Sequence, residues 1–386
     1  MKHFRNLDKK TIINTFEYLP QPFNKFTQKD VLANALGATM YTQGINKDIA
    51  QKLINQDFHG LTSNVLCLED SIGDDDVAEA QINIFNQLEL LETSIKSGIM
   101  HVDDLPLLFI RVRSLGQLKI FLRKADKLGL ICGFNIPKFS TSNGYEYLDA
   151  IQKANDKFNQ RFYAMPILET SEIIYNETRI SELAKMKSII DDYKNLILNI
   201  RVGGTDFSSL YGIRRGIDFS IYDIFVISHC LSDIVNVFGR STENYTISGP
   251  VWEYFPDSNR MLKPQLRVTP FIKKGINGPE ERIDIISKEI DGLIKEIILD
   301  KANGFTGKTI IHPSHITYVN ALQVITYEEY HDALRIVENQ DKGAIKSFSG
   351  NKMNEVKPHY NWAVKVLKKA EVYGVLKADV DYVQLF

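Results

Sequence analysis

Two acidic side chains follow predicted strands at the points where those strands end. Glu169 comes directly after an apolar run, and Asp206 follows a β-branched run across the pair Gly203-Gly204. Because the carboxyl ends of parallel strands meet at one edge of a sheet, we expect the two carboxylates to lie close together. Two carboxylates, completed by water and substrate, are a common way to hold Mg²⁺. Ion pairs with Arg111 and Lys138 would explain the same two residues equally well.

Other charged residues also stand at predicted strand ends. Arg111 follows the apolar run L-P-L-L-F-I, so burial of its guanidinium requires an anionic partner. That partner is either a substrate carboxylate or developing enolate, or Glu169 in a structural salt bridge. Lys138 follows the next predicted strand, and Glu69 and Asp70 open the turn after an earlier one. The strand interiors, by contrast, are almost uncharged.

Two further motifs carry less chemical information. The segment 304–309, G-F-T-G-K-T, ends like a phosphate-binding loop, but the first glycine of that motif would fall at position 302, which is alanine. The predicted strand also follows the glycines instead of preceding them, so we predict no nucleotide-binding loop. His312 ends that strand, where a lone histidine is more often a hydrogen-bonded rim residue than a base. The acidic run 74–76 is explained as the cap and first turn of a helix.

Short β-rich runs alternate with stretches of helical periodicity from residue 35 onward. The predicted strands are 36–41, 63–68, 106–112, 130–136, 162–168, 196–202, 245–251 and 308–311. The predicted helices are 47–56, 75–97, 115–128, 145–158, 180–193, 221–238 and 280–302. Eight strands alternating with helices predict an α/β protein built as a (β/α)8 barrel, whose active site lies at the carboxyl ends of the strands.

The flanking segments divide the chain further. Residues 1–34 are predicted to form an N-terminal arm, 35–325 the barrel and catalytic domain, and 326–386 a C-terminal helical extension or lid. This extension contains predicted helices at 328–339 and 358–372. Residues 255–279 hold four prolines and two glycines without clear periodicity, so we predict a long loop insertion near the site.

Composition excludes several classes of partner. A formal net charge of −2 with 24% charged residues gives no basic excess, so nucleic acid is not an expected partner. No segment has about 18 uninterrupted apolar residues, and the N-terminus lacks an apolar targeting region, so we expect a cytoplasmic protein without a membrane partner. Three widely spaced cysteines inside apolar runs suit buried thiols in a reducing compartment.

Taken together, an ordered set of motifs resembles the citrate lyase β-subunit-like branch of the HpcH/HpaI aldolase superfamily. The resemblance extends over residues 35–372, and the last of the motifs is the most specific. The motifs are V-L-C-L-E-D-S (65–71), F-I-R-V-R (109–113), I-P-K (136–138), P-I-L-E-T (166–170), G-G-T-D-F (203–207) and G-F-T-G-K-T-I-I-H-P-S-H-I (304–316). The polar tail and the insertions are similar to divergent carbon–carbon bond lyases encoded near tellurium-resistance-type genes.

This resemblance implies a TIM barrel that cleaves or forms a carbon–carbon bond by retro-Claisen or retro-aldol chemistry through a metal-stabilised enolate. The substrate would be a β-hydroxyacyl thioester, with coenzyme A as its carrier, or a related keto or hydroxy acid. The metal would be Mg²⁺, with Mn²⁺ as an alternative. A homo-oligomer built from trimers is also implied.

The resemblance also assigns roles by position. The metal ligands would be Glu169 and Asp206, and Arg111 would bind the substrate carboxylate or the enolate oxygen. The remaining candidate catalytic residues are Glu69, Asp70, Lys138 and Glu355, and the further candidate substrate-binding residues are Gly204, Thr205 and His312.

Some positions depart from the family pattern. Relatives commonly have D-L-E-D where this chain has Cys67-Leu-Glu-Asp, and R-V-N where it has Arg111-Val-Arg113. In relatives a tail segment of the K-M-V-D type brings an aspartate over the site, often from a neighbouring subunit. Here K-M-N-E puts Glu355 at that position.

Three alternatives remain at this level. The barrel could hydrolyse a thioester after enolate formation. It could be a pyruvate aldolase, although the second-strand motif of those enzymes pairs glutamate with histidine, whereas Glu69 is followed by Asp70. It could also be a binding or scaffold protein that retained a metal site, a hypothesis that the altered residues Cys67 and Arg113 favour.

Overall fold

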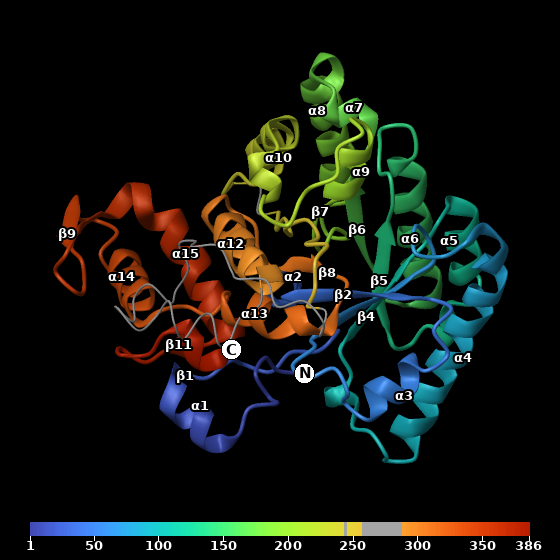
Figure 1. Cartoon of the computed structure of the whole chain (residues 1–386), viewed down its shortest axis with the longest axis horizontal. Helices are drawn as coiled ribbons and strands as arrows, with labels where there is room; N and C mark the ends of the chain where they lie inside the picture. Colours follow the sequence, from blue (N-terminus) through green and yellow to red (C-terminus); the bar gives the residue numbers. More distant parts are fainter. Residues whose placement is uncertain (243–244, 257–287) are drawn as a thin grey trace.

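A parallel β-sheet forms the centre of the molecule, as shown by the computed structural model, which describes residues 1–242, 245–256 and 288–386 (Figure 1). Its strand order is β7-β6-β5-β4-β3-β2-β8. The strands are β2 (Ala38–Gln43), β3 (Ser63–Cys67), β4 (Leu107–Arg111), β5 (Ile131–Ile136), β6 (Tyr163–Leu168), β7 (Arg201–Val202) and β8 (Lys308–Ile310). All neighbouring pairs are parallel and follow the order of the predicted strands.

The predicted strand 245–251 joins the two edges of this sheet. It is present as two isolated parallel bridges, Ile200 to Ile247 and Gly249 to Lys308, and not as a continuous strand. Backbone hydrogen bonds support both bridges, with the Ser248 N–H donating to the Ile200 carbonyl over 2.9 Å and the Gly249 N–H donating to the Gly307 carbonyl over 3.0 Å. Because β7 and β8 are the edges of the sheet, these bridges close it into a barrel.

Helices follow the barrel strands as the sequence predicts. They are α3 (Ile49–Ile54), α4 (Val77–Lys96), α5 (Leu115–Leu122), α6 (Gly144–Phe158), α7 (Ser171–Ile174), α8 (Asn176–Asp192), α9 (Gly204–Ser209), α10 (Phe225–Phe238), α12 (Lys288–Ala302) and α13 (Ile316–Ala321). The short α7, α9 and α13 were not predicted. Residues 280–287 of the predicted helix 280–302 and residues 257–279 of the predicted loop lie outside the described residues.

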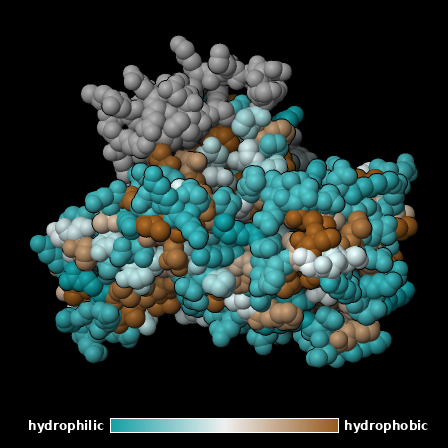
Figure 2. All heavy atoms as spheres, turned by 90° about the horizontal axis from the view of Figure 1, so that it is seen from below, coloured by the Kyte–Doolittle hydropathy of each residue, from teal (hydrophilic) through white to brown (hydrophobic). Residues whose placement is uncertain are grey.

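Hydrophilic residues cover most of the face seen in Figure 2, with smaller hydrophobic patches among them. None of the helices in the described parts of the chain combines the length and the apolar character that crossing a bilayer requires.

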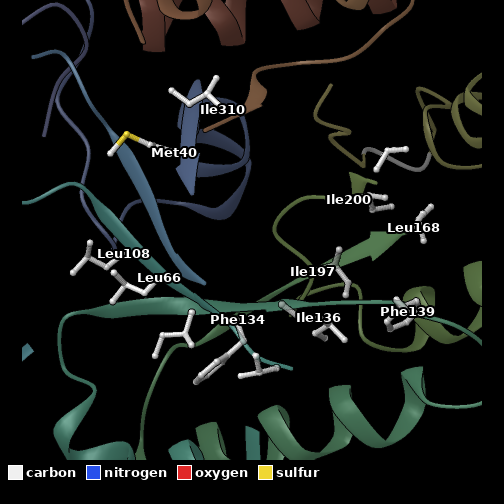
Figure 3. Packing of buried hydrophobic residues seen from close by; sticks show 14 of the residues in the cluster. Met40, Leu66, Leu108, Phe134, Ile136, Phe139, Leu168, Ile197, Ile200 and Ile310 are labelled. Atoms are coloured by element: carbon white, nitrogen blue, oxygen red, sulfur yellow. The ribbon is translucent and has the colours of Figure 1, made fainter. Parts of the chain in front are cut away.

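Side chains of the barrel strands alternate between two buried environments, as expected for parallel strands that are covered on both faces. Leu66, Leu108 and Phe134 belong to a cluster that includes residues of the outer helices, among them Leu118 of α5 (Figure 3). Phe109, which lies between two such residues along β4, belongs to a different cluster inside the barrel. Both clusters are almost completely buried, so the strands contribute core residues from both faces of the sheet.

The N-terminal segment packs against the interior of the barrel at the amino ends of its strands. This segment contains α1 (Lys9–Thr15), β1 (Phe16–Tyr18) and α2 (Lys29–Ala35). Phe4, Phe16 and Phe23 join the interior cluster of Phe109 and Met165. His3 is fully buried there, and its Nε2 lies 3.0 Å from the Ala35 carbonyl oxygen. The aromatic residues that the sequence scatters through residues 1–34 therefore cover one end of the barrel, which leaves the carboxyl end as the open one.

Buried ion pairs tie the barrel to α12. Lys308 is fully buried, and its Nζ lies 2.9 Å from Glu296 Oε1 and 2.7 Å from Asp300 Oδ2. Arg215 contacts the same Glu296 over 2.5 Å. The lysine of the G-K-T segment is thus a structural residue, in agreement with the prediction that the segment is not a nucleotide-binding loop.

The C-terminal segment forms a separate hydrophobic cluster beside the barrel. Its elements are α14 (Tyr327–Glu338), β9 (Ala344–Lys346), β10 (Met353–Glu355), α15 (Val356–Tyr373) and β11 (Val375–Leu376). The two helices were predicted, whereas the β9–β10 hairpin was not. Antiparallel pairing of β11 with β1 links the two ends of the chain. The boundaries at residues 34 and 325 remain predictions.

Candidate active site

Charged residues from five strand ends meet at the carboxyl end of the barrel. Arg111 is the last residue of β4, and Glu169 directly follows β6. Glu69 and Asp70 follow β3, Lys138 follows β5, and Asp206 lies in the first turn of α9 after β7. Burial differs among them, because Glu69, Arg111 and Glu169 are buried whereas the Lys138 and Asp70 side chains are about half exposed.

Arg111 is the centre of this group. Its Nη2 lies 2.6 Å from Glu69 Oε2, 3.1 Å from Asp70 Oδ2 and 3.3 Å from Glu169 Oε1. Burial alone would lower the pKa of Arg111, but the surrounding negative charges, that of Glu169 foremost, raise it above its usual value. All three contacts use Nη2, and the buried Nε has no hydrogen-bond acceptor in the part of the chain that the structure describes. The guanidinium therefore keeps donors that no side chain of the site uses.

Lys138 positions Glu169 through its backbone. Its φ of +48° is a left-handed conformation that is uncommon for a residue other than glycine and costs about 1–3 kcal/mol. This conformation lets the Lys138 N–H donate to Glu169 Oε1 over 2.8 Å, while Nζ donates to Glu69 Oε1 over 3.0 Å. Since Oε1 of Glu169 is bound by Lys138 and Arg111, the other oxygen, Oε2, is the one that remains available.

The available oxygen of Glu169 faces Asp206 across Gly203. A Cβ added to Gly203 would lie 2.3 Å from Glu169 Oε2 and 3.1 Å from Asp206 Oδ2. Both carboxylates thus converge on the space beside a residue that has no side chain. Gly204 is less constrained, because a Cβ there would lie 3.1 Å from Pro250 Cβ and 3.3 Å from Ile221 Cδ1. The approach of the two carboxylates therefore requires glycine at position 203, whereas the packing of α9 favours a small residue at position 204.

The two carboxylates carry an excess of negative charge. Burial, together with the nearby charge of Asp206, raises the pKa of Glu169 to about 8 against the opposing effect of Arg111. Burial and the charge of Asp70 also raise the pKa of Asp206. Hard carboxylate oxygens held close together at raised pKa values fit a divalent cation, which would neutralise both. Among the described residues no group of three or more histidines, cysteines or carboxylates forms a closed metal site, so any cation here would keep water or substrate as ligands.

The acidic pair after β3 behaves differently. Burial and a hydrogen bond to Asp70 raise the pKa of Glu69. The pKa of Asp70 is lowered: burial opposes the shift, but the hydrogen bond from Glu69 and the charges of Arg111 and Lys138 outweigh it. Two neighbouring carboxyl groups whose pKa values move apart can divide the roles of proton donor and proton acceptor.

A cavity of about 730 Å³ opens at this end of the barrel. Six of the predicted site residues line it: Asp70, Arg111, Glu169, Gly204, Thr205 and Asp206. The Thr205 hydroxyl donates to Glu253 over 3.3 Å at the rim. The structure therefore brings together the metal-ligand candidates, the candidate anion-binding arginine and two of the candidate substrate-binding residues around one space.

Two predicted residues lie elsewhere. His312 stacks on Phe255 with ring centroids 4.5 Å apart, and its Nδ1 lies 2.8 Å from the Ser314 hydroxyl, as expected of a rim residue. Glu355 pairs with Ala344 in the β9–β10 hairpin, at the outer end of the tail in Figure 1. Within one chain it does not reach the cavity, so a role for it there requires a second chain, as the resemblance implied.

Several residues of the cavity were not predicted from the sequence. The most important is Arg201, which stands one residue before the end of the predicted strand that leads to Asp206 and is almost completely buried. Tyr41, Cys67 and Thr309 also line the cavity. The signal for Arg201 was the one that identified Arg111, namely a single charged residue inside an otherwise apolar strand.

Arg113, a departure from the family pattern, holds the loop that carries Glu69. Its guanidinium forms an ion pair with Asp74 and donates to the Leu68 and Ile72 carbonyl oxygens over 3.3 and 2.7 Å. The run Asp74–Asp76 forms a short 3₁₀ turn before α4, in agreement with its predicted structural role.

The fold and the site together define a (β/α)8 barrel with an acidic and guanidinium-lined mouth. Residues 30–375 match the model of a family described as the C–C bond lyases of the TIM-barrel fold, and the chain belongs to this family. This confirms the predicted fold class and the resemblance to citrate lyase β-subunit-like proteins. No curated protein that was compared matches the chain significantly.

Two solved structures share the fold at low sequence identity. A citrate lyase from Burkholderia xenovorans is 14% identical with a TM-score of 0.58, and the match covers 91% of this chain and 96% of that one. The protein CitE from Mycobacterium tuberculosis, solved with magnesium, acetoacetate and coenzyme A, is 16% identical with a TM-score of 0.52 and covers 88% and 99%.

Proposed function

We propose that this protein is a Mg²⁺-dependent carbon–carbon bond lyase. Its substrate is a β-hydroxyacyl thioester or a related keto or hydroxy acid, cleaved by retro-aldol or retro-Claisen chemistry or formed in the reverse direction. The observation that carries the proposal is the convergence of Glu169 and Asp206 on Gly203, beside Arg111 and within one cavity. The similar CitE protein was solved with magnesium, acetoacetate and coenzyme A, which supports a thioester as the substrate and coenzyme A as its carrier.

Glu169 Oε2 and the Asp206 carboxylate would hold the cation. A Mg²⁺ ion held by them would supply Lewis-acid polarisation of a substrate carbonyl or carboxylate and would favour negative charge on oxygen. Lys138 and Arg111 fix the other oxygen of Glu169, so the ligand is already oriented before any cation binds. Mn²⁺ suits the same oxygen ligands and is the alternative ion.

Arg111 stabilises the oxyanion that develops when the carbon–carbon bond breaks. Its Nη2 is bound by three carboxylates, which fix the plane of the guanidinium, while its Nε has no acceptor. A donor that is fixed before the reaction and aimed at developing charge is the strongest general source of catalysis in such sites.

Asp70 is the general base in this proposal. It lines the cavity, and Arg111 and Lys138 keep it ionised because their charges lower its pKa. The proton of the substrate β-hydroxyl passes to Asp70 as the bond to the neighbouring carbon breaks and its electron pair forms the enolate. Positioned bases of this kind contribute about 10²- to 10⁴-fold to rate. Glu69 accepts from Arg111 and Lys138 and so holds these two cations beside Asp70.

The rim residues complete the substrate site. The backbone of Gly204 and the hydroxyl of Thr205 line the cavity next to Asp206, and His312 stands at the edge with Phe255. A homo-oligomer built from trimers would allow Glu355 of one chain to cover the cavity of the next. The tail hairpin that carries Glu355 is exposed in a single chain, which suits such a contact.

Calorimetric titration with Mg²⁺ tests the metal site. Wild type should bind, and the isosteric variants Glu169→Gln and Asp206→Asn should each lose at least tenfold in affinity. Glu172→Gln is the matched control, because it removes an exposed carboxylate three residues along the chain without touching the cavity. Absence of Mg²⁺ and Mn²⁺ binding to the wild type would refute the proposed function.

A product assay tests the reaction. β-Hydroxyacyl-coenzyme A compounds and 2-keto acids are incubated with the Mg²⁺-loaded protein, and carbonyl products and free thiol are measured in parallel. Lyase activity releases a carbonyl compound and leaves the thioester intact, whereas a thioester hydrolase releases free thiol. Binding of Mg²⁺ without either product from the whole panel would favour a binding or scaffold protein.

A further inference from the structure

Arg201 is buried inside the barrel directly below the mouth of the cavity. It belongs to β7 and is 1% exposed. Its guanidinium donates from Nη2 to the Thr309 hydroxyl over 2.5 Å and from Nη1 to the Thr39 hydroxyl over 3.4 Å. It also lies 5.7 Å from the ring centroid of Tyr41. These contacts are all to neutral groups, from strands β2 and β8.

No carboxylate neutralises Arg201. Among residues 1–242, 245–256 and 288–386, none of the acidic side chains forms an ion pair with its guanidinium, and its buried Nε has no acceptor. Arg215 is a useful contrast, because it is equally buried but contacts Glu296 over 2.5 Å and Glu253 over 3.5 Å. A buried charge without a counter-ion is strongly unfavourable, so natural proteins pair such groups.

The side chain faces the cavity, and the other arginine there cannot take its place. Arg201 and Arg111 both line the same space, but Arg111 is already paired with three carboxylates. Burial lowers the pKa of Arg201, and the charge of Arg111 lowers it further. An anion that enters the cavity would therefore find one guanidinium satisfied and one without a counter-ion.

We propose that Arg201 is a second anion subsite, which binds a carboxylate of the substrate at a position separate from Arg111 and the Glu169–Asp206 pair. The substrate would thus carry a distal carboxylate in addition to the carbonyl group at which its carbon–carbon bond is cleaved. The planar guanidinium fits a carboxylate through two parallel hydrogen bonds, and the hydroxyls of Thr39 and Thr309 hold the plane of the guanidinium in the pocket. A phosphate oxyanion would satisfy the same donors.

This inference rests on the proposed function for the identity of the reaction, but not for the binding itself. A purely structural role is the competing explanation, since Arg201 links β7 to β2 and β8 inside the barrel. The two explanations differ in what the guanidinium does for stability. A structural linker lowers the melting temperature when it is removed. If the guanidinium is instead an uncompensated charge that binds a ligand, replacing it with a neutral side chain of similar length leaves the melting temperature unchanged or raises it.

The test compares wild type with Arg201→Met, Arg201→Lys and the control Arg123→Gln, which removes one exposed charge from the end of α5. Melting temperatures are measured without ligand, and affinities for malonate, succinate and inorganic phosphate are measured by calorimetry. Each titration is done with excess Mg²⁺ and again with EDTA.

For wild type we expect binding of at least one of the two dicarboxylates. Arg201→Met should weaken it about tenfold to hundredfold, the range expected for a charge-assisted hydrogen-bonded contact. Arg201→Lys should weaken it less, and Arg123→Gln should not change it. Tighter binding of phosphate than of either dicarboxylate, with the same loss in Arg201→Met, would keep the subsite and assign it to a phosphate group.

Three outcomes would overturn the inference. These are unchanged affinity in Arg201→Met, no binding of any of the three anions to wild type, or a clear fall in melting temperature for both Arg201 variants. The EDTA series separates this result from the proposed function, because anion binding at Arg201 needs no metal. A protein that binds malonate through Arg201 but takes up no Mg²⁺ would retain the subsite and lose the proposed lyase activity.

Discussion

Replacement of Lys308 by methionine should destabilise the barrel by a predictable amount. Lys308 is fully buried in β8, and its Nζ contacts Glu296 and Asp300 of α12 over 2.9 and 2.7 Å. Methionine keeps much of the length of the side chain and removes the charge. The change therefore leaves packing largely intact and leaves two buried carboxylates with one cation fewer.

The two carboxylates differ in how many of their partners remain after Lys308 is replaced. Among the described residues, Glu296 keeps Arg215 at 2.5 Å and the Ile221 N–H at 2.7 Å, whereas the Asp300 side chain keeps only the Tyr222 hydroxyl at 2.8 Å. Removing one partner of a buried ion pair costs about 3–5 kcal/mol. We expect a loss in that range at pH 8, carried mainly by Asp300.

The loss should shrink at lower pH. Burial raises the pKa of Asp300 to about 6 even with Lys308 present, against 3.8 for an exposed aspartate. Without Lys308 the folded-state pKa rises further, so the folded variant binds a proton that the unfolded chain does not bind above pH 3.8. Proton uptake by the folded state stabilises it as the pH falls, and it removes the uncompensated charge. The difference from wild type should therefore be smaller at pH 5.5 than at pH 8.

Urea unfolding followed by circular dichroism measures these differences. The double variant Lys308→Met/Asp300→Asn should recover most of the stability at pH 8, because the orphaned charge is gone. Lys153→Met, which removes an exposed lysine from α6, serves as the control and should leave the midpoint unchanged. A loss below about 1 kcal/mol for Lys308→Met, or no recovery in the double variant, would refute the reasoning from buried charge.

Two further changes test other parts of the molecule. Gly203→Ala should abolish Mg²⁺ binding in calorimetry, since the new Cβ would lie 2.3 Å from Glu169 Oε2. A variant that binds Mg²⁺ with wild-type affinity would contradict the assignment of Glu169 and Asp206 as the metal ligands. His3→Gln should weaken the dependence of stability on pH. Burial lowers the pKa of His3 to about 3, so the unfolded chain binds the proton first and the stability present above pH 6.5 is lost as the pH falls. The wild type should lose about 1.4 kcal/mol more per pH unit than the variant between pH 6 and pH 4 in urea unfolding, and parallel curves would contradict this.

The order of the barrel strands was predictable because the local pattern is strong. Parallel strands that are covered on both faces appear as short uncharged runs, and helices between them appear as stretches of helical periodicity. The charged residues that end these runs, such as Arg111 and Glu169, were therefore visible as interruptions. The seventh predicted strand, 245–251, was recognised from the same uncharged pattern, although in the structure it forms two isolated bridges and no continuous strand.

Contacts between distant parts of the chain were not predictable. The aromatic residues of the first 34 residues gave no periodic signal, yet Phe16 and Phe23 fill the end of the barrel together with Phe109. The pairing of β1 with β11 joins residues more than 350 positions apart. Such contacts depend on the shape of the assembled barrel, which no local window of the sequence contains.

The site was predicted through charged residues near the ends of strands, and one of these residues was missed. Arg111 was recognised because it stands one residue before the end of a predicted strand, beside other charged residues. Arg201 was missed because Gly203, Gly204 and Asp206 follow it closely and carry the stronger signal of a metal site. The left-handed conformation of Lys138 was also not predictable from the sequence, since glycine and asparagine are the residues that normally adopt it.

The charges at the mouth of the barrel suggest why residue 67 is an uncharged cysteine. Apart from the ion pair of Glu253 with Arg215, four carboxyl groups, Glu69, Asp70, Glu169 and Asp206, lie among three cations, Arg111, Lys138 and Arg201. With all four ionised they carry an excess of one negative charge, which a divalent cation would convert into an excess of one positive charge that a single substrate carboxylate neutralises. Cys67 lines the same cavity and pairs in register with Arg111. An aspartate at that position would supply the neutralising charge from the protein, whereas the uncharged thiol leaves it to be supplied by the ligand.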